Sequence, residues 1–180
     1  MKRTTLSALT LVALMIAGAA QAETYLKGEI GGGFSDSYDI GSGKADLDNA
    51  WLFGGAVGAS LSPHTRLEGE LLYSKADLQG GGTAKATVGF ANGYYDFGDG
   101  TQITPFVGAG LGYGKFDTSA GNDNSWAYQL TAGASKTLSP GLTAELAYRY
   151  LKAPDLQLSG LDASYKTSAI TAGLRWKFGS

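Results

Sequence analysis

The stretch SAITAGLRWKF, from Ser168 to Phe178, alternates strictly between apolar and polar side chains. The apolar residues at every second position are Ile170, Ala172, Leu174, Trp176 and Phe178. Successive side chains of a β-strand point to opposite faces, so this stretch predicts a strand with one wholly apolar face. That face covers either a protein core or a lipid phase, and the rest of the sequence distinguishes the two.

Eight segments of the chain share this period of two. They are residues 25–34, 49–61, 65–76, 85–97, 103–116, 126–138, 142–152 and 165–178. Most of them reach the roughly 9–11 residues that a tilted strand needs to cross a bilayer. One residue breaks the pattern, because Asn92 falls on the apolar side of its segment with Val88, Phe90 and Tyr94. The sequence gives no account of Asn92.

The connections between these segments alternate in length. Three are tight, at residues 62–64, 98–102 and 139–141, whereas four are longer and polar, at residues 35–48, 77–84, 117–125 and 153–164. Short turns on one side and long loops on the other are typical of outer-membrane barrels. The sequence therefore predicts an all-β fold: an eight-stranded, antiparallel, up-and-down transmembrane β-barrel. Both termini are expected on the periplasmic, short-turn side.

The N-terminal residues predict the compartment. Lys2 and Arg3 precede an apolar run from Leu6 to Ala17, and Ala20-Gln21-Ala22 follows. This is the pattern of a secretory signal peptide, with a charged start, an apolar centre and a small-residue cleavage site. We expect residues 1–22 to be a cleaved signal peptide and residues 23–180 to be the barrel domain, in the outer membrane of a Gram-negative bacterium.

Aromatic residues gather near both ends of the predicted strands. At these depths amphipathic rings form interfacial girdles around outer-membrane barrels. The residues expected at the loop end are Trp51, Tyr73, Tyr113, Trp126, Tyr128, Tyr148 and Tyr150, and those at the turn end are Tyr25, Tyr94, Phe97, Trp176 and Phe178.

Nine charged side chains fall on the predicted inward face. They are Lys27, Glu29, Arg66, Glu68, Glu70, Glu145, Arg149, Arg175 and Lys177. Buried charges must be paired and hydrogen-bonded, so we expect a polar network in the lumen, with Glu145 and Arg175 as partners. The small inward residues of the same face are expected to leave room for water; they are Gly108, Gly110, Gly112, Gly114 and Gly133.

Patterns for catalysis, metals and cofactors are weak. The one histidine, His64, falls in a predicted turn, and the chain has no cysteine. We therefore predict no enzyme activity and no catalytic, cofactor or metal site. The 14 Lys and Arg residues are outnumbered by 16 Asp and Glu residues, so no nucleic-acid partner is expected.

Three stretches resemble one known group of proteins. YYDFGDG (Tyr94 to Gly100), TPFVGAGLGYG (Thr104 to Gly114) and the terminal LRWKF are similar to the eight-stranded barrels of the OmpA-like and opacity-like porin superfamily. The resemblance implies a structural or adhesive role without catalytic residues. It also implies that Trp176 and Phe178 form the signal read by the barrel-assembly machinery, although Gly179 and Ser180 follow them here.

The sequence thus predicts a monomeric barrel in outer-membrane lipid. Its expected role is envelope integrity, adhesion or host interaction, with an extracellular protein or surface ligand bound through long loops. A narrow porin-like channel is the alternative, and a lipid A-modifying enzyme is a further one. The ligand and the physiological role cannot be derived from the residues.

Overall fold

The computed structural model describes residues 23–33, 36–40, 43–78, 83–98, 103–118, 121–158 and 161–178. Residues 1–22, the expected signal peptide, lie outside this range. The described residues form nine strands: β1 (Glu23–Gly33), β2 (Asp36–Ile40), β3 (Gly43–Ser60), β4 (Thr65–Leu78), β5 (Thr83–Asp96), β6 (Ile103–Thr118), β7 (Gly121–Ser139), β8 (Leu142–Leu158) and β9 (Leu161–Phe178).

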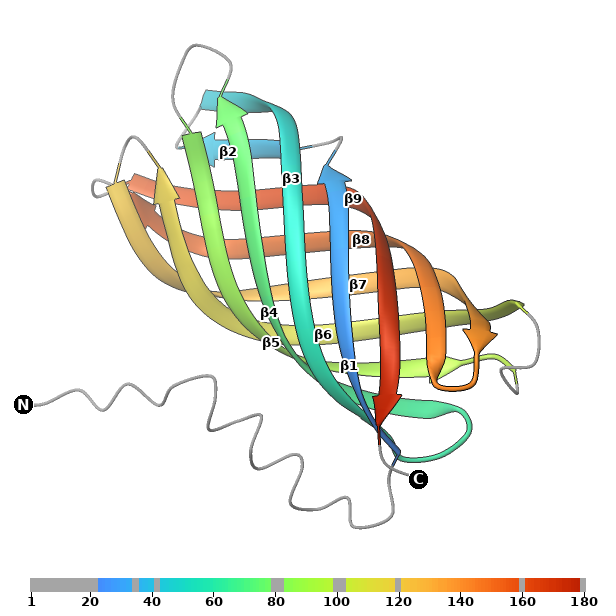
Figure 1. Ribbon diagram of the computed structural model, residues 1–180. Helices are drawn as coiled ribbons and strands as arrows, with labels where there is room; N and C mark the ends of the chain where they lie inside the picture. Colours follow the sequence, from blue (N-terminus) through green and yellow to red (C-terminus); the bar gives the residue numbers. More distant parts are fainter. Residues whose placement is uncertain are drawn as a thin grey trace, which may run out of the picture.

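All the strand pairs are antiparallel, and the sheet closes on itself. From β3 to β9 each strand pairs with the next one along the chain. Strand β1 pairs with both β3 and β9, and β2 pairs with the same two strands farther along. The two strands β1 and β2 thus occupy one position in the barrel, which gives the predicted closed eight-stranded barrel (Figure 1).

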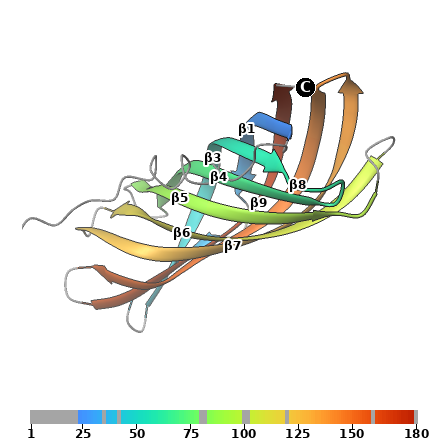
Figure 2. The same ribbon diagram turned by 90° about the horizontal axis from the view of Figure 1, so that it is seen from below.

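The two ends of the barrel differ. Thr24 lies opposite Phe178, so both ends of the barrel domain lie on one side, which we name the turn side. Tight connections on this side include the Pro140–Gly141 turn, in which Gly141 has φ of +83°, a conformation that favours glycine. The opposite side, where the hairpin β8–β9 ends, is named the loop side (Figures 1 and 2).

The four longer polar connections contain more paired strand than the sequence predicted. Strand β2 and the start of β3 occupy most of residues 35–48, and β8 and β9 extend to Leu158 and from Leu161. Strand pairing likewise continues to Leu78, Thr83, Thr118 and Gly121. Backbone hydrogen bonds extend a hairpin regardless of side-chain polarity, so polar connections continue as paired strand. The remaining residues of these four connections lie outside the described part of the chain.

The wall of the barrel is a single sheet, so each strand alternates between an inward and an outward face. The alternation is visible in β5, where every second residue from Ala84 to Asp96 is buried. Large apolar side chains such as Leu111, Trp126 and Trp176 are about two-thirds exposed on the outside. Among the described residues there is no helix long and apolar enough to span a membrane.

Candidate functional site

An ionic cluster occupies the turn-side part of the lumen. It contains Lys27, Glu29, Arg66, Glu68, Glu70, Asp96, Glu145, Arg149 and Arg175. Each of these side chains is at most 10% exposed. Eight of the nine charges predicted to face inward are therefore gathered here, and Asp96 is the member that the sequence did not reveal.

Lys27 joins three strands at the centre of the ionic cluster. Its Nζ lies 3.1 Å from Glu29 Oε2 on β1 and 3.4 Å from Glu68 Oε2 on β4. The same amine lies 3.5 Å from Glu145 Oε2 on β8, so it bridges strands on different sides of the lumen. A single ammonium group shared by three carboxylates ties the barrel wall together across its interior.

Arg149 anchors the part of the ionic cluster farthest from the turn side. Its Nη1 donates to Glu70 Oε1 at 2.6 Å and to Gln129 Oε1 at 2.8 Å. The other carboxylate oxygen of Glu70 accepts from Asn92 Nδ2 and Gln129 Nε2, both at 2.7 Å. Both oxygens of this buried carboxylate are therefore satisfied by charged or amide donors, as burial requires.

Arg66 makes a two-pronged ion pair with Asp96. Its Nε lies 2.6 Å from Asp96 Oδ2, and its Nη2 lies 2.9 Å from Asp96 Oδ1. Its Nη1 also donates to Glu68 at 3.1 Å, and Tyr25 Oη donates to the same carboxylate at 2.8 Å. Planar forks of this kind are the strongest geometry for a guanidinium and a carboxylate.

Arg175 makes looser contacts. Its Nη1 lies 3.2 Å from Glu145 Oε1, which is the pair expected from the sequence. This contact lacks hydrogen-bond geometry, because both atoms are without a hydrogen-bond partner among the described residues. The guanidinium carbon lies 5.0 Å from the centre of the Tyr25 ring, a cation–π distance.

Lys177 does not belong to the ionic cluster, contrary to the prediction. Its side chain is 40% exposed and pairs with Glu23, which is 60% exposed. Lys177 has the same register as Arg175, which points inward. However, Lys177 is the penultimate residue of β9, at the end of the barrel, where its side chain is exposed to solvent. Alternation alone does not show where along a strand the interior ends.

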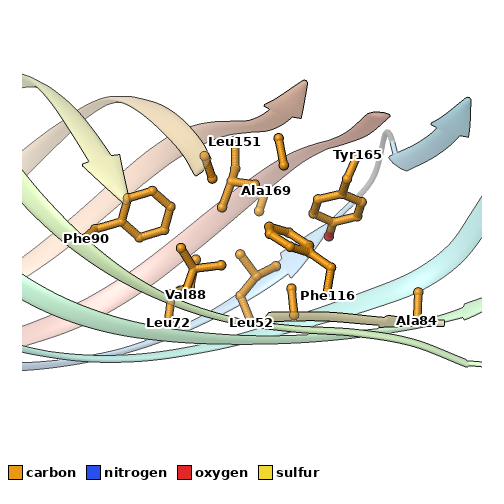
Figure 3. Close-up of a cluster of buried hydrophobic side chains, with 12 residues drawn as sticks. Leu52, Leu72, Ala84, Val88, Phe90, Phe116, Leu151, Tyr165 and Ala169 are labelled. Atoms are coloured by element: carbon orange, nitrogen blue, oxygen red, sulfur yellow. The ribbon is translucent and has the colours of Figure 1, made fainter. Parts of the chain in front are cut away.

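An apolar cluster fills the lumen on the loop side of the ionic cluster. It contains Leu52, Leu72, Ala84, Ala86, Val88, Phe90, Phe116, Ala127, Leu151, Ala153, Tyr165 and Ala169. Figure 3 shows the side chains of Leu52, Leu72 and Val88 on one wall pointing toward those of Leu151 and Ala169 on the other. Phe116 and Tyr165 have ring centres 5.9 Å apart within this layer. None of the clustered residues is more than 6% exposed.

The apolar face of β5 points into the lumen, whereas the sequence predicted that the apolar faces of the strands meet lipid. Val88, Phe90, Asn92 and Tyr94 all lie inside the barrel, at most 4% exposed. Asn92 therefore fits the pattern, since it is the hydrogen-bonding partner of Glu70 on the inner face. An apolar face on a barrel strand need not meet lipid when the lumen itself holds an apolar cluster.

Glycines of β6 leave the space that the inward side chains of β5 occupy. In register, Gly108 faces Tyr94, Gly110 faces Asn92 and Gly112 faces Phe90. A Cβ atom added to any of these glycines would overlap the larger side chain opposite. The prediction that they leave room for water was wrong, because side chains of β5 occupy that space. Gly133 likewise faces Phe106.

Two of the aromatic residues predicted for the girdles lie inside the barrel instead. Tyr25 is 0% exposed and Tyr94 is 4% exposed, and both contact the ionic cluster. A hydroxyl group that can bond a carboxylate and a ring that can face a guanidinium suit a charged interior as well as an interface. Tyr95, at 48% exposure, takes the outward place beside Phe97, with ring centres 5.0 Å apart.

The other predicted girdle residues face outward and are exposed or half-buried. On the loop side these are Trp51, Tyr73, Tyr113, Trp126, Tyr128, Tyr148 and Tyr150, and on the turn side Phe97, Trp176 and Phe178. Tyr113 and Trp126 pack edge to face with ring centres 5.4 Å apart. Between the two groups lie exposed aliphatic residues such as Leu71, Leu111 and Leu146. This band has the composition of a surface in contact with lipid.

His64 lies in the exposed turn between β3 and β4. Its Nδ1 lies 3.1 Å from the backbone oxygen of Asp96, and its ring stacks on Tyr95 with centres 5.9 Å apart. Within the described residues, no group of three or more His, Cys, Asp or Glu side chains could hold a metal ion.

Comparison with known proteins agrees with this geometry. Residues 7–178 match the family described as outer membrane protein beta-barrel domain. The chain belongs to this family. It is an integral β-barrel protein of a Gram-negative outer membrane.

Individual relatives are more distant. The outer membrane protein PagN of Salmonella typhimurium is 24% identical over 164 residues, covering 81% of this chain and 66% of that protein. A candidate adhesin of Rickettsia bellii is 29% identical over 173 residues, covering 77% of this chain and 73% of that protein. The chain therefore spans about two-thirds to three-quarters of the length of these relatives.

The crystal structure of Neisserial surface protein A has the same fold. It superposes with a TM-score of 0.69 at 17% identity, covering 86% of this chain and 97% of that chain. At this identity the likeness shows the fold alone.

Proposed function

We propose that this protein makes surface contacts through the hairpins of its loop side, as an adhesive or envelope-stabilising barrel. The observation that carries the proposal is the filled lumen. The ionic cluster and the apolar cluster follow one another along the barrel axis, and their residues are buried. Outside the lumen and the lipid-facing band lie the turns of the turn side and the strand ends beyond the loop-side girdle. With the chain ends on the periplasmic side, as the sequence predicts, the loop-side strand ends are the ones that face the exterior.

The hairpins suit a contact role because their strands are already paired. Strands β8 and β9 remain paired as far as Leu158 and Leu161, beyond Tyr150 in the loop-side girdle. A rigid hairpin loses little conformational entropy when it binds a partner. The description of one relative, the candidate adhesin of Rickettsia bellii, supports this proposal.

Binding of bacteria that express the protein tests this role. Replacing residues 154–164 by a two-residue turn should reduce attachment to host matrix or to neighbouring cells severalfold. The matched control alters a turn-side connection, Pro140→Ala, and should leave attachment unchanged. Equal attachment by cells that carry shortened versions of all the loop-side hairpins would refute the role.

The channel alternative is disfavoured by the apolar cluster. Ions crossing the lumen would have to pass a layer that includes Leu52, Leu72 and Leu151, each 1% exposed. Moving a charge into such an apolar layer is very unfavourable. We expect no discrete openings of the purified protein in planar bilayers, whereas steady openings that a folded Arg175→Gln variant abolished would establish a channel.

The enzyme alternative lacks a site in the described residues. The imidazole of His64 contacts a backbone oxygen and a tyrosine ring, on the turn side of the barrel. A lipid A-modifying enzyme needs its acid–base group at the outer leaflet, which the sequence places on the loop side. Mass spectrometry of lipid A from cells with and without the protein should show identical species.

Assembly and oligomeric state complete the proposal. We infer that Trp176 and Phe178 are read by the barrel-assembly machinery, and that the protein is a monomer in outer-membrane lipid. Both side chains are outward and exposed, at 69% and 46%. Trp176→Ala combined with Phe178→Ala should lower the amount of folded protein in the outer membrane, while refolding of the same variant in detergent should be little affected.

A further inference from the structure

The ionic cluster contains more acidic than basic side chains. Its five carboxyl groups belong to Glu29, Glu68, Glu70, Asp96 and Glu145, and its four cationic groups belong to Lys27, Arg66, Arg149 and Arg175. If every group were ionised, the cluster would carry one uncompensated negative charge. Such a charge is very unfavourable in a buried site, and none of these side chains is more than 10% exposed.

The described residues around the cluster do not balance this charge. Lys177, the next basic residue along β9, is 40% exposed and paired with Glu23. Within the described part of the chain, no group of three or more His, Cys, Asp or Glu side chains could hold a metal ion. A proton bound to one of the five carboxyl groups balances the cluster without a further cation.

Four of the five carboxyl groups are well matched to a negative charge. Both oxygens of Asp96 accept from Arg66, and both oxygens of Glu70 accept from guanidinium or amide donors. The oxygens of Glu68 accept from hydroxyl, guanidinium and ammonium donors. Glu145 has three cationic groups within 3.5 Å. A proton on any of these four groups would weaken contacts that the ionised form makes.

Glu29 has different surroundings. Its neighbours in register are Gly54 on β3 and Gly173 on β9, so the adjacent strands offer no side-chain donor there. Its Oε1 lies 2.5 Å from Arg149 Nη2, but neither atom has a hydrogen-bond partner among the described residues. Its Oε2 lies 3.1 Å from Lys27 Nζ, an amine that two other carboxyl groups also contact. These surroundings favour a negative charge less than those of the other four carboxyl groups.

Glu29 and Glu70 share one guanidinium group. Arg149 directs Nη2 toward Glu29 Oε1 and Nη1 toward Glu70 Oε1. The two carboxyl groups are also close enough to share a hydrogen bond. Two carboxylates cannot hydrogen-bond to each other, because neither has a proton to donate. A single proton between them removes their repulsion and leaves one negative charge for Arg149.

We propose that Glu29 and Glu70 bind one proton between them at neutral pH, and that this buried proton completes the charge balance of the lumen. Glu29 carries the proton and donates it in a hydrogen bond to Glu70. The titratable and charged groups that face this pair are Lys27 on β1, Glu68 on β4, Tyr94 on β5, and Glu145 and Arg149 on β8.

The proposal has a consequence for folding. Glutamate side chains of an unfolded chain are ionised at neutral pH, so the barrel takes up one proton when it folds. A rise in pH should therefore favour the unfolded chain. This inference does not depend on the surface-contact role, because it concerns the turn-side lumen and not the hairpins.

Two matched variants, Glu29→Gln and Glu70→Gln, test where the proton lies. Glutamine has the shape of a protonated glutamate, so Glu29→Gln should leave the urea midpoint at about pH 6 unchanged. Glu70→Gln should lower it, because the new amide would face Arg149 and the amide donors that now bond to Glu70. A loss for Glu29→Gln as large as that for Glu70→Gln would mean that Glu29 is ionised, which overturns the proposal.

The pH dependence of unfolding counts the proton. Between about pH 6 and about pH 8, the unfolding equilibrium constant of the parent should rise relative to that of Glu29→Gln by about tenfold per pH unit, since the folded parent holds one proton more than the unfolded chain. Glu23→Gln changes an exposed carboxylate and should keep the slope of the parent. Parallel profiles for the parent and Glu29→Gln would contradict the uptake of a proton.

Infrared spectroscopy detects the proton without any substitution. At neutral pH the folded parent should show the carbonyl band of a protonated carboxylic acid, and carbon-13 labelling of its glutamates should shift that band. The band should be missing in Glu29→Gln and retained in Glu23→Gln. If Glu29→Gln does not fold, the labelled parent decides, since a folded parent without the band holds no such proton. Stability that is lost when choline replaces sodium and potassium would show that a small cation balances the cluster instead.

Discussion

The turn-side and loop-side parts of the lumen are both buried, yet they are filled in opposite ways. The ionic cluster holds side chains that are charged and linked across the barrel, such as Lys27 to Glu145. The apolar cluster holds Leu52, Leu72 and Phe116, which contact one another without directional bonds. A charged interior depends on every partner being present, whereas an apolar interior depends on shape and volume.

This difference predicts different responses to substitution. Removing one charge leaves its buried partners uncompensated, so the cost extends beyond the altered residue. Removing an apolar group leaves a cavity whose cost is set by its size. The following experiments test that contrast, from the largest expected effect to the smallest.

Arg149→Met should cause the largest loss. Glu70 would lose its guanidinium partner and Glu29 one of its two ion pairs, which costs about 3–5 kcal/mol of unfolding free energy. Urea unfolding in detergent micelles, followed by tryptophan fluorescence, measures this loss. Adding Glu70→Gln to the variant should restore part of it, because one uncompensated charge is then removed. If the double variant is no more stable than Arg149→Met, the cost does not come from the charge.

Leu72→Ala tests the apolar cluster, with its neighbour Leu71→Ala as the matched control. Leu72 is 1% exposed and faces the lumen, whereas Leu71 is 56% exposed and faces outward. A cavity at Leu72 should cost about 2–5 kcal/mol, and the loss at Leu71 should be clearly smaller. The same urea titration compares the two, and equal losses would mean that the loop-side lumen is not tightly packed.

Gly108→Ala tests the fit between β5 and β6. A Cβ at this position would overlap the Tyr94 ring, so we expect a loss of about 1–3 kcal/mol from overpacking. Gly55→Ala is the control, since nothing lies within 4 Å of its added Cβ. The combination of Gly108→Ala with Tyr94→Ala should show less than the sum of the two single losses in thermal unfolding. Additive losses would contradict a direct contact.

Arg175→Gln should be the mildest of the changes to the ionic cluster. Its contact with Glu145 lacks hydrogen-bond geometry, and Glu145 retains Lys27 and Arg66 as partners. The loss of unfolding free energy in the urea titration should therefore be smaller than for Arg149→Met. Lys177 belongs to an exposed ion pair, so Lys177→Gln should lower the unfolding free energy by at most about 1 kcal/mol. A loss at Arg175 as large as at Arg149 would mean that all members of the cluster are energetically equivalent.

Much of the barrel follows from the sequence, because strand alternation is a local property. Each predicted segment lies on one of the barrel strands, and Arg66, Glu70 and Arg149 are buried on the face that alternation assigned to them. The even number of predicted strands correctly places both ends of the barrel domain on one side, since Thr24 lies opposite Phe178. Loop lengths were overestimated, because polar residues continue a hairpin as readily as they end one.

The sequence by itself determined the fold, the strand number and the charges that line much of the lumen, since these follow from a period of two and from the cost of placing charge in lipid. Only the tertiary structure decided which face of β5 points inward. Val88, Phe90 and Tyr94 suit either side of the wall, whereas Asn92 suits the inner side, and the β6 glycines opposite them leave space there. That choice depends on packing between strands, and it places Tyr94, a predicted girdle residue, in the charged interior.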